Sequence, residues 1–274
     1  MKKITILLIF SIYLFGYERV VALSPSINEI IFALNCGDKI IGNTNCCKYP
    51  IESIQKIKVG GYFSPSLEKI ISLKPDLVIL QENSSDFDKK LNKVGIETKV
   101  VKINSLESIK TAILDIGTIF NNQQKAKEIV QKIDNSIINL KGIVENKKIL
   151  ISIGYNLELS KEIYAVGQNL YFNDIIKASG NQNAIDESSK GQPVLNFEKI
   201  LKLNPDIVII LAPMMEEKNI STQQLISPWL KLPINAGKSK SIFVQYHEYS
   251  GIPSDRVVNF IDDFRGFLSA VKNR

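Results

Sequence analysis

The chain has 274 residues, of which 45% are hydrophobic and 23% charged, and its formal net charge is +6. This composition excludes a disordered or fibrous chain, and the length allows one large domain or two lobes with separate cores. One histidine and three cysteines are too few for a zinc finger or a multi-histidine metal cage. Basic and acidic residues are interspersed along the sequence, so we expect no nucleic-acid partner.

The N-terminus carries two lysines and then an apolar run, Ile4 to Phe15. A positive start followed by about a dozen apolar residues is typical of a secretory signal peptide, whereas a spanning helix needs roughly 20. We therefore expect a signal peptide over residues 1–16 and a periplasmic protein, with an uncleaved membrane anchor as the alternative. There, Cys36 could form a disulfide with Cys46 or Cys47, although structural or incidental cysteines are favoured over ligand contact.

The first half of the mature chain alternates strands and helices. Val20–Leu23 is an expected strand, and it leads into a helix over Ile27–Leu34 whose start we assign to a capping box of Ser26 and Glu29. Further strands are expected at Ile40–Gly42, Leu77–Leu80 and Thr98–Ile103. Short apolar strands between helices indicate a parallel sheet covered by helices.

Residues 122–146 show helical periodicity without proline, and they predict one long helix that links residues 17–121 to residues 147–274. At 1.5 Å per residue, this rod would be roughly 35–40 Å long and would limit hinge motion. The second half repeats the alternation, with expected strands at Ile149–Ile153, Ile207–Leu211 and Ser241–Gln245.

Two segments of the chain repeat without gaps at an offset of 130 residues. Residues 61–80 and 191–210 share Glu-Lys-Ile, Leu, Pro-Asp and Val-Ile in register, so Glu68 matches Glu198. Each copy reads as a loop, a short helix, a Pro-Asp turn and a buried strand. The repeat therefore predicts two Rossmann-like α/β lobes with central parallel sheets, joined by the single long helix, with a ligand cleft between them.

With these motifs in this order, the chain resembles the periplasmic substrate-binding proteins of ABC importers that have a helical backbone and carry cobalamin, haem or ferric siderophores. The matching stretches cover essentially the whole mature chain, among them Arg19-Val-Val-Ala-Leu-Ser-Pro-Ser, Val59-Gly-Gly-Tyr-Phe and Asn173-Asp-Ile-Ile-Lys-Ala-Ser-Gly. In that family, one glutamate on each lobe pairs with arginines of the permease dimer in the inner membrane. The resemblance assigns this docking role to Glu68 and Glu198, whose other role is to complement a helix dipole.

The ligand is expected at loops that leave the carboxyl ends of the strands. Aromatic and soft side chains in these loops suit a large, partly apolar ligand, although ordinary loop packing explains each one singly. The expected ligand-binding residues are Ser24, Cys46, Tyr62, Phe63, Tyr155, Met214, Met215, His247 and Tyr249. His247 is the only histidine and a candidate ligand of the chelated metal.

Two departures from the family pattern bear on the ligand. Cys46 stands where the family often has an aromatic residue, which puts a standard cobalamin contact in doubt. None of the four arginines falls in the expected cleft loops, which lowers the rank of anionic siderophores, and we assign Arg256 to structural capping.

The sequence thus predicts a monomeric binding protein, with no intrinsic cofactor, that delivers a metal chelate to an ABC importer. Corrinoid ranks first, haem second, and a ferric siderophore or small metal complex third. The alternatives are direct binding of a small metal complex or oxyanion, a tetrapyrrole metal chelatase that would use His247 with Glu248, and a sensor or adaptor of the same fold.

Overall fold

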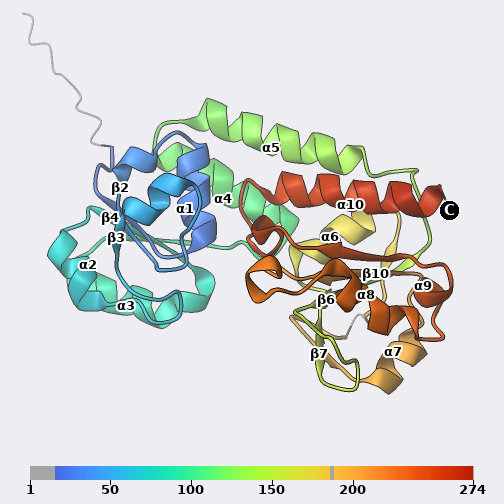
Figure 1. The fold of residues 1–274 in the computed structure, drawn as a ribbon. Coiled ribbons are helices and arrows are strands. Elements are labelled where there is room, and N and C mark those ends of the chain that lie inside the picture. Colours follow the sequence, from blue (N-terminus) through green and yellow to red (C-terminus); the bar gives the residue numbers. More distant parts are fainter. Residues whose placement is uncertain (1–15, 186–187, 274) are drawn as a thin grey trace, which may run out of the picture.

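The protein forms two α/β lobes, one after the other along the chain (Figure 1). The structure is a computed structural model that describes residues 16–185 and 188–273. The expected signal peptide lies outside these residues except for Gly16. Among the described residues, no helix is both long and apolar enough to cross a membrane.

The N-terminal lobe contains a parallel sheet in the order β3-β2-β1-β4-β5. Its central strand, β1, is fully buried, as the apolar sequence predicts. The strands are β1 (Val20–Ala22), β2 (Ile40–Asn43), β3 (Ile57–Lys58), β4 (Leu77–Gln81) and β5 (Thr98–Val101).

The C-terminal lobe contains a sheet in the order β11-β10-β6-β7-β9, with β8 paired to β6. β11, β10, β6 and β8 pair in parallel, whereas β7 pairs antiparallel with both β6 and β9. The strands are β6 (Lys148–Ile153), β7 (Ile163–Ala165), β8 (Gln182–Asn183), β9 (Val194–Leu195), β10 (Ile207–Leu211) and β11 (Ile242–Gln245). The expected parallel core is confirmed, and the short strands β7 to β9 were not predicted because two or three residues carry no periodicity.

Helices cover both sheets. The α-helices are α1 (Pro25–Ala33), α2 (Leu67–Leu73), α3 (Ser85–Lys93), α4 (Leu106–Ile119), α5 (Gln123–Ile138), α6 (Tyr171–Ala178), α7 (Phe197–Leu203), α8 (Thr222–Leu230), α9 (Asn235–Lys238) and α10 (Val257–Lys272). Short 3₁₀ helices are η1 (Gly37–Lys39), η2 (Ile51–Gln55), η3 (Glu82–Ser84), η4 (Glu216–Lys218) and η5 (Glu248–Gly251).

The sequence repeat folds into the same unit in both lobes. Helices α2 and α7 have seven residues each, end in a left-handed residue (Lys74 and Asn204), and lead into β4 and β10. Asp76 and Asp206 also have equivalent roles. The Asp76 carboxylate accepts a hydrogen bond from the backbone N–H of Arg19, just before β1, and the Asp206 carboxylate accepts one from Lys148, the first residue of β6. The helix, the left-handed turn and the strand of the repeat therefore have the same structural basis in both lobes.

The linking helix is shorter than expected. α5 ends at Ile138 instead of continuing to residue 146, and the chain then turns through Gly142, whose φ is +74°. A left-handed residue cannot continue a right-handed helix, and glycine adopts this conformation without a steric penalty. α5 nevertheless lies across both lobes, beside α4 and α10 (Figure 1).

One apolar core joins the two lobes. It includes α1 residues such as Ile27 and α4 residues such as Ile113 from the first lobe, together with Ile133 of α5, Ile175 of α6 and Phe264 of α10. Two smaller cores lie within the individual lobes. The lobes are therefore held together by packed helices rather than by a flexible linker.

The start of α1 differs from the expected capping box. Ser24, not Ser26, is the N-cap, and its hydroxyl accepts a hydrogen bond from the backbone N–H of Ile27. Proline is well suited to the first helical position, and α1 therefore begins at Pro25, earlier than the predicted start at Ile27. Glu29 consequently has no capping role, and it is buried with only 2% of its surface exposed.

Candidate ligand-binding site

Two adjoining cavities lie between the lobes. The larger has a volume of about 740 Å³ and the smaller about 430 Å³, and both are lined by residues of each lobe. Pro25, Cys46, Gly251 and Ile252 line both cavities, so the two form one interlobe cleft. The cleft is bordered by loops that follow parallel strands, where ligands bind in open α/β folds.

A tight loop presents two aromatic side chains to the larger cavity. Gly60, with φ of +117°, and Pro65 pair across the base of the loop, and a Cβ at Gly60 would lie only 2.8 Å from the carbonyl oxygen of Ser64. At its tip, Tyr62 and Phe63 pack edge to face with ring centroids 4.6 Å apart. The Tyr62 hydroxyl donates to Gln81 Oε1 at 2.7 Å, whereas Phe63 is 89% exposed. Phe63 is thus an uncovered apolar surface at the cleft.

The loop after β2 places Cys46 in both cavities. Lys58 holds this loop, because its Nζ donates to Asn43 Oδ1 and to the carbonyl oxygens of Thr44, Cys47 and Ser53. Burial lowers the pKa of Lys58 below its ordinary value. The thiols divide by exposure, since Cys46 is exposed while Cys36 and Cys47 are buried, and all three are free.

The C-terminal lobe brings fewer of the expected residues to the cleft. Met214 lines the smaller cavity, and its φ of +62° is an uncommon conformation for a non-glycine residue. Met215, by contrast, is 5% exposed and packs into the core of that lobe. The Tyr155 hydroxyl donates to the carbonyl oxygen of Pro213, and Lys218 lies 4.8 Å from the centre of its ring.

His247 lies outside the lining of both cavities as far as the described chain shows. It is exposed and stacks between Tyr246 and Tyr249, with ring centroids 4.4 and 5.0 Å away. The Tyr249 hydroxyl donates to Asp263 at 2.5 Å, and burial and this carboxylate raise the pKa of Tyr249. Residues 16–185 and 188–273 contain no cluster of three histidine, cysteine or acidic side chains that could hold a metal ion.

Ser24 and several unexpected residues complete the description of the cleft. Ser24 is fully buried as a helix cap. The start of α6, which sequence analysis did not place at the site, contributes Leu170, Tyr171 and Phe172 to the larger cavity. The apolar character of this segment was visible, but its approach to the cleft depends on how α6 packs between the lobes.

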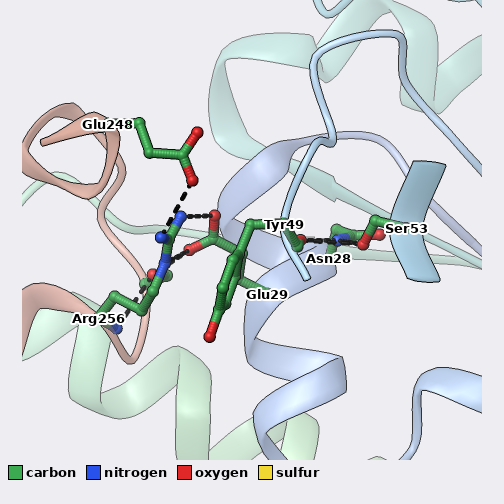
Figure 2. A network of polar contacts seen from close by, with 7 residues as sticks. Asn28, Glu29, Tyr49, Ser53, Glu248 and Arg256 are labelled. Atoms are coloured by element: carbon green, nitrogen blue, oxygen red, sulfur yellow. Dashed lines mark hydrogen bonds and ion pairs between the residues drawn. The ribbon is translucent and has the colours of Figure 1, made fainter. Parts of the chain in front are cut away.

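The most consequential residue missed is Arg256. Its guanidinium donates to both carboxylate oxygens of Glu29 and, at 3.3 Å, to Glu248 Oε1, and it lies 3.8 Å from the centre of the Tyr49 ring (Figure 2). Arg256 is the N-cap residue of α10, in line with the predicted structural role, but its side chain makes no cap hydrogen bond and instead joins the two lobes. Only the tertiary fold brings residues 29 and 256 together.

Burial determines the charge balance around Arg256. It raises the pKa of Glu29, against hydrogen bonds from Arg256 and Ser254 that favour the carboxylate. Burial and the neighbouring Glu29 charge also raise the pKa of Asp255 to about 7. The Asp255 Oδ1 atom is buried and has no hydrogen-bond partner within the described chain.

Glu68 and Glu198 lie in the first turns of α2 and α7, and both are exposed. Ser66 and Asn196 cap these helices through their side chains, so neither glutamate is needed as a cap. Figure 1 shows α2 and α7 on separate lobes at the side of the molecule away from α5.

The fold and the interlobe cleft define a two-lobed α/β binding protein. Residues 20–244 match the family model described as periplasmic binding protein, and the chain belongs to that family. An uncharacterized ABC transporter substrate-binding lipoprotein of Bacillus subtilis, YvrC, is 31% identical over 202 residues, which are 70% of this chain and 63% of that protein. A vitamin B12-binding protein of Vibrio parahaemolyticus is 24% identical, covering 94% of this chain and 91% of its own.

Solved structures show the same fold. The periplasmic vitamin B12-binding protein BtuF of Vibrio cholerae has a TM-score of 0.79 at 18% identity, over 94% of this chain and 99% of its own. The periplasmic haem-binding protein HutB of Vibrio cholerae has a TM-score of 0.76 at 19% identity, over 91% of this chain and 98% of its own. The predicted family and the two-lobed α/β fold are confirmed.

Proposed function

We propose that the protein captures a metal chelate, a corrinoid in the first place, in the interlobe cleft and delivers it to an ABC importer. The observation that carries this proposal is the pair of adjoining cavities lined by both lobes, with Tyr62, Phe63 and Phe172 on their walls. Aromatic walls suit a large and partly apolar ligand, and polar side chains such as Gln81, Asn104 and Gln192 in the same lining can fix its orientation. The similarity to vitamin B12-binding proteins supports the choice of a corrinoid.

The test is a titration of the purified protein with hydroxocobalamin, haemin and a ferric siderophore, followed by absorbance and calorimetry. Trp229, the only tryptophan, is buried in the C-terminal core, so its fluorescence is not a direct reporter of the cleft. We expect a saturable one-to-one complex with hydroxocobalamin. Absence of a complex with all three compounds would refute the proposal.

A matched pair of variants tests whether the cleft is the binding site. Phe63→Ala removes an exposed ring that lines the larger cavity, and Phe197→Ala removes an exposed ring on α7 that lies outside both linings. We expect Phe63→Ala to weaken binding about tenfold, in line with one lost stacking contact, and Phe197→Ala to leave it unchanged. Equal effects of the two variants would exclude the cleft.

Haem is the second candidate ligand. Its iron accepts His, Cys, Met or Tyr as an axial ligand, and Cys46, Tyr62 and Met214 line the cavities while His247 does not. A haem complex whose absorbance spectrum changes in Cys46→Ser or Tyr62→Phe, and not in His247→Ala, would favour this alternative over the corrinoid.

Binding without turnover is the expected activity. The rival function, insertion of a metal into a tetrapyrrole, would need a base beside the substrate; of the two predicted candidates, Glu248 lines the smaller cavity, whereas His247 lies outside both cavity linings. Incubation with a free tetrapyrrole and ferrous or cobaltous ions should give no metallated product. Accumulation of such a product beyond one equivalent would establish an enzyme instead.

We propose that the protein acts in the periplasm and that its partner is the permease of an ABC importer. A periplasmic protein that acts as a monomer would present Glu68 and Glu198 to the two halves of an importer permease in the inner membrane. The lipoprotein relative from Bacillus subtilis supports the importer assignment. Mass analysis of the protein recovered from cells tests the signal peptide. Cleavage near residue 16 would give a mass that lacks residues 1–16, whereas the full mass would show that the segment is retained.

A further inference from the structure

The Glu29–Arg256 pair differs from the other ion pairs of the described chain. Their side chains are only 2% and 9% exposed, whereas every other ion pair there has at least one partner that is 44% or more exposed. A buried ion pair requires close geometry, because both charges have lost their water. Here the geometry is bidentate, with Nε 3.0 Å from Oε2 and Nη2 2.5 Å from Oε1.

The pair joins elements of different lobes. Glu29 lies on α1 of the N-terminal lobe, and Arg256 precedes α10 of the C-terminal lobe. A second contact reinforces the same junction, because the Ser254 hydroxyl donates to Glu29 Oε2 at 2.6 Å. The spacing of α1 and the start of α10 is therefore fixed by three hydrogen bonds to one buried carboxylate.

The same guanidinium reaches the wall of the ligand cleft. It stacks on Tyr49, whose carbonyl oxygen accepts hydrogen bonds from Asn28 and Ser53, and it contacts Glu248 (Figure 2). Glu29, Tyr49 and Glu248 all line the smaller cavity. One side chain thus connects the relative position of the lobes to the shape of that cavity.

We propose that Arg256 is a positioning residue whose pairing with Glu29 clamps the two lobes at the smaller cavity and thereby slows ligand dissociation. The effect on dissociation rests on the proposed function, whereas the clamp itself does not. Most changes of affinity at a preformed site appear in the dissociation rate, which is where loss of the clamp should be seen.

The test uses the double variant Glu29→Gln/Arg256→Met, which removes both charges of the pair, so that neither of the two is left buried without its partner. Arg265→Met is the matched control, because Arg265 lies on the same helix α10 and its ion pair with Asp262 is exposed. Spin labels at Lys69→Cys and Lys199→Cys, two exposed and equivalent positions on α2 and α7, report the distance between the lobes. The spin-labelled proteins carry Cys46→Ser, since Cys46 is the exposed thiol, whereas hydroxocobalamin binding and release are measured on unlabelled proteins that keep Cys46.

We expect the double variant to show a broader interlobe distance distribution and to release hydroxocobalamin about tenfold faster in stopped-flow experiments, with the control unchanged. An unchanged distance distribution would overturn the clamp. A broader distribution with an unchanged release rate would overturn the positioning role. Failure of the parent protein to bind hydroxocobalamin would refute the corrinoid proposal, and the distance measurement would still decide the clamp.

Discussion

The Asp255 carboxyl group lies near the charges of Glu29 and Arg256, and its pKa is nevertheless raised. Asp255 precedes Arg256 in the chain, and the Glu29 carboxylate acts on it from the other lobe. Glu248 contacts the same guanidinium, so two carboxylates pair with Arg256, whose charge also acts on Asp255. Because the Asp255 Oδ1 atom is buried and has no partner in the described chain, ionisation of this residue is unfavourable in the folded state.

The first prediction concerns pH and stability. The pKa of Asp255 is about 7 in the folded protein and near its ordinary value of 3.8 when unfolded. Between these values the folded state binds more protons, so stability falls as the pH rises through this range. From pH 5 to pH 8 we expect a loss of about 2–3 kcal/mol that is absent in Asp255→Asn. Urea unfolding of both proteins at the two pH values measures this loss of unfolding free energy. An equal loss in the parent protein and in Asp255→Asn would show that Asp255 is not its source.

The second prediction concerns the cysteines. Cys46 is exposed at the cleft, whereas Cys36 and Cys47 are buried and burial raises the pKa of both thiols. Because the thiolate is the reactive form, we expect an alkylating reagent to modify only Cys46 in the folded protein. Saturating hydroxocobalamin should protect it. Peptide mass analysis gives the modified positions, and labelling of Cys46 at the same rate with and without ligand would place the ligand elsewhere.

At the scale of elements, the loop between β2 and η2 depends on polar contacts rather than on regular structure. Four oxygen acceptors converge on the Lys58 ammonium, and Asn28 and Asn43 add hydrogen bonds to the same segment. This arrangement orients the loop that carries Cys46 and Tyr49 to the cleft. The loop is thus anchored from β3, a strand of only two residues.

The third prediction tests this anchoring. Lys58→Met removes the hydrogen bonds of the ammonium to Asn43 Oδ1 and to the Cys47 carbonyl oxygen, which should cost about 1–3 kcal/mol of unfolding free energy and weaken ligand binding. Lys69→Met, at an exposed position on α2, is the control and should change neither quantity. Chemical denaturation and the hydroxocobalamin titration provide the two readouts. Normal binding by Lys58→Met would show that the loop keeps its shape without the lysine.

The longer parallel strands of both sheets were predictable because buried parallel strands are continuous apolar runs, whereas the two- and three-residue strands β3, β7, β8 and β9 were not. Ile207–Leu211 was predicted with its exact bounds, and Val20–Leu23 to within one residue. The end of α5 was missed because periodicity continues beyond Ile138, whereas the helix ends there in turns that lead to the left-handed Gly142. Local patterns thus identify elements well and their ends less well.

The cleft was predictable in part for a related reason. Its loops follow from the order of the strands, so residues such as Cys46, Tyr62 and Met214 were named in advance and lie in the cavity walls. Glu29 and Arg256 were both given local capping roles, since local sequence offers no other partner. Their contact joins positions 227 residues apart, and only the packing of α1 against the start of α10 creates it.

The last prediction concerns the whole molecule and its importer. Glu68 and Glu198 lie in the first turns of the equivalent helices α2 and α7, which are on separate lobes (Figure 1), and one charge on each lobe would orient the protein on a permease dimer. We expect Glu68→Lys/Glu198→Lys to bind hydroxocobalamin normally but to reduce stimulation of the importer's ATP hydrolysis at least about tenfold, because like charges would then oppose the arginines that the family resemblance implies on the permease.

Glu52→Lys is the matched control, since Glu52 is an exposed glutamate in the first turn of η2 and lies outside the repeat. ATP hydrolysis by the cognate importer in lipid vesicles, measured against protein concentration, separates weaker docking from slower turnover. Docking by charge predicts that high salt lowers stimulation by the parent protein and narrows its difference from the charge-reversed variant. Full stimulation by the double variant would exclude these glutamates from docking.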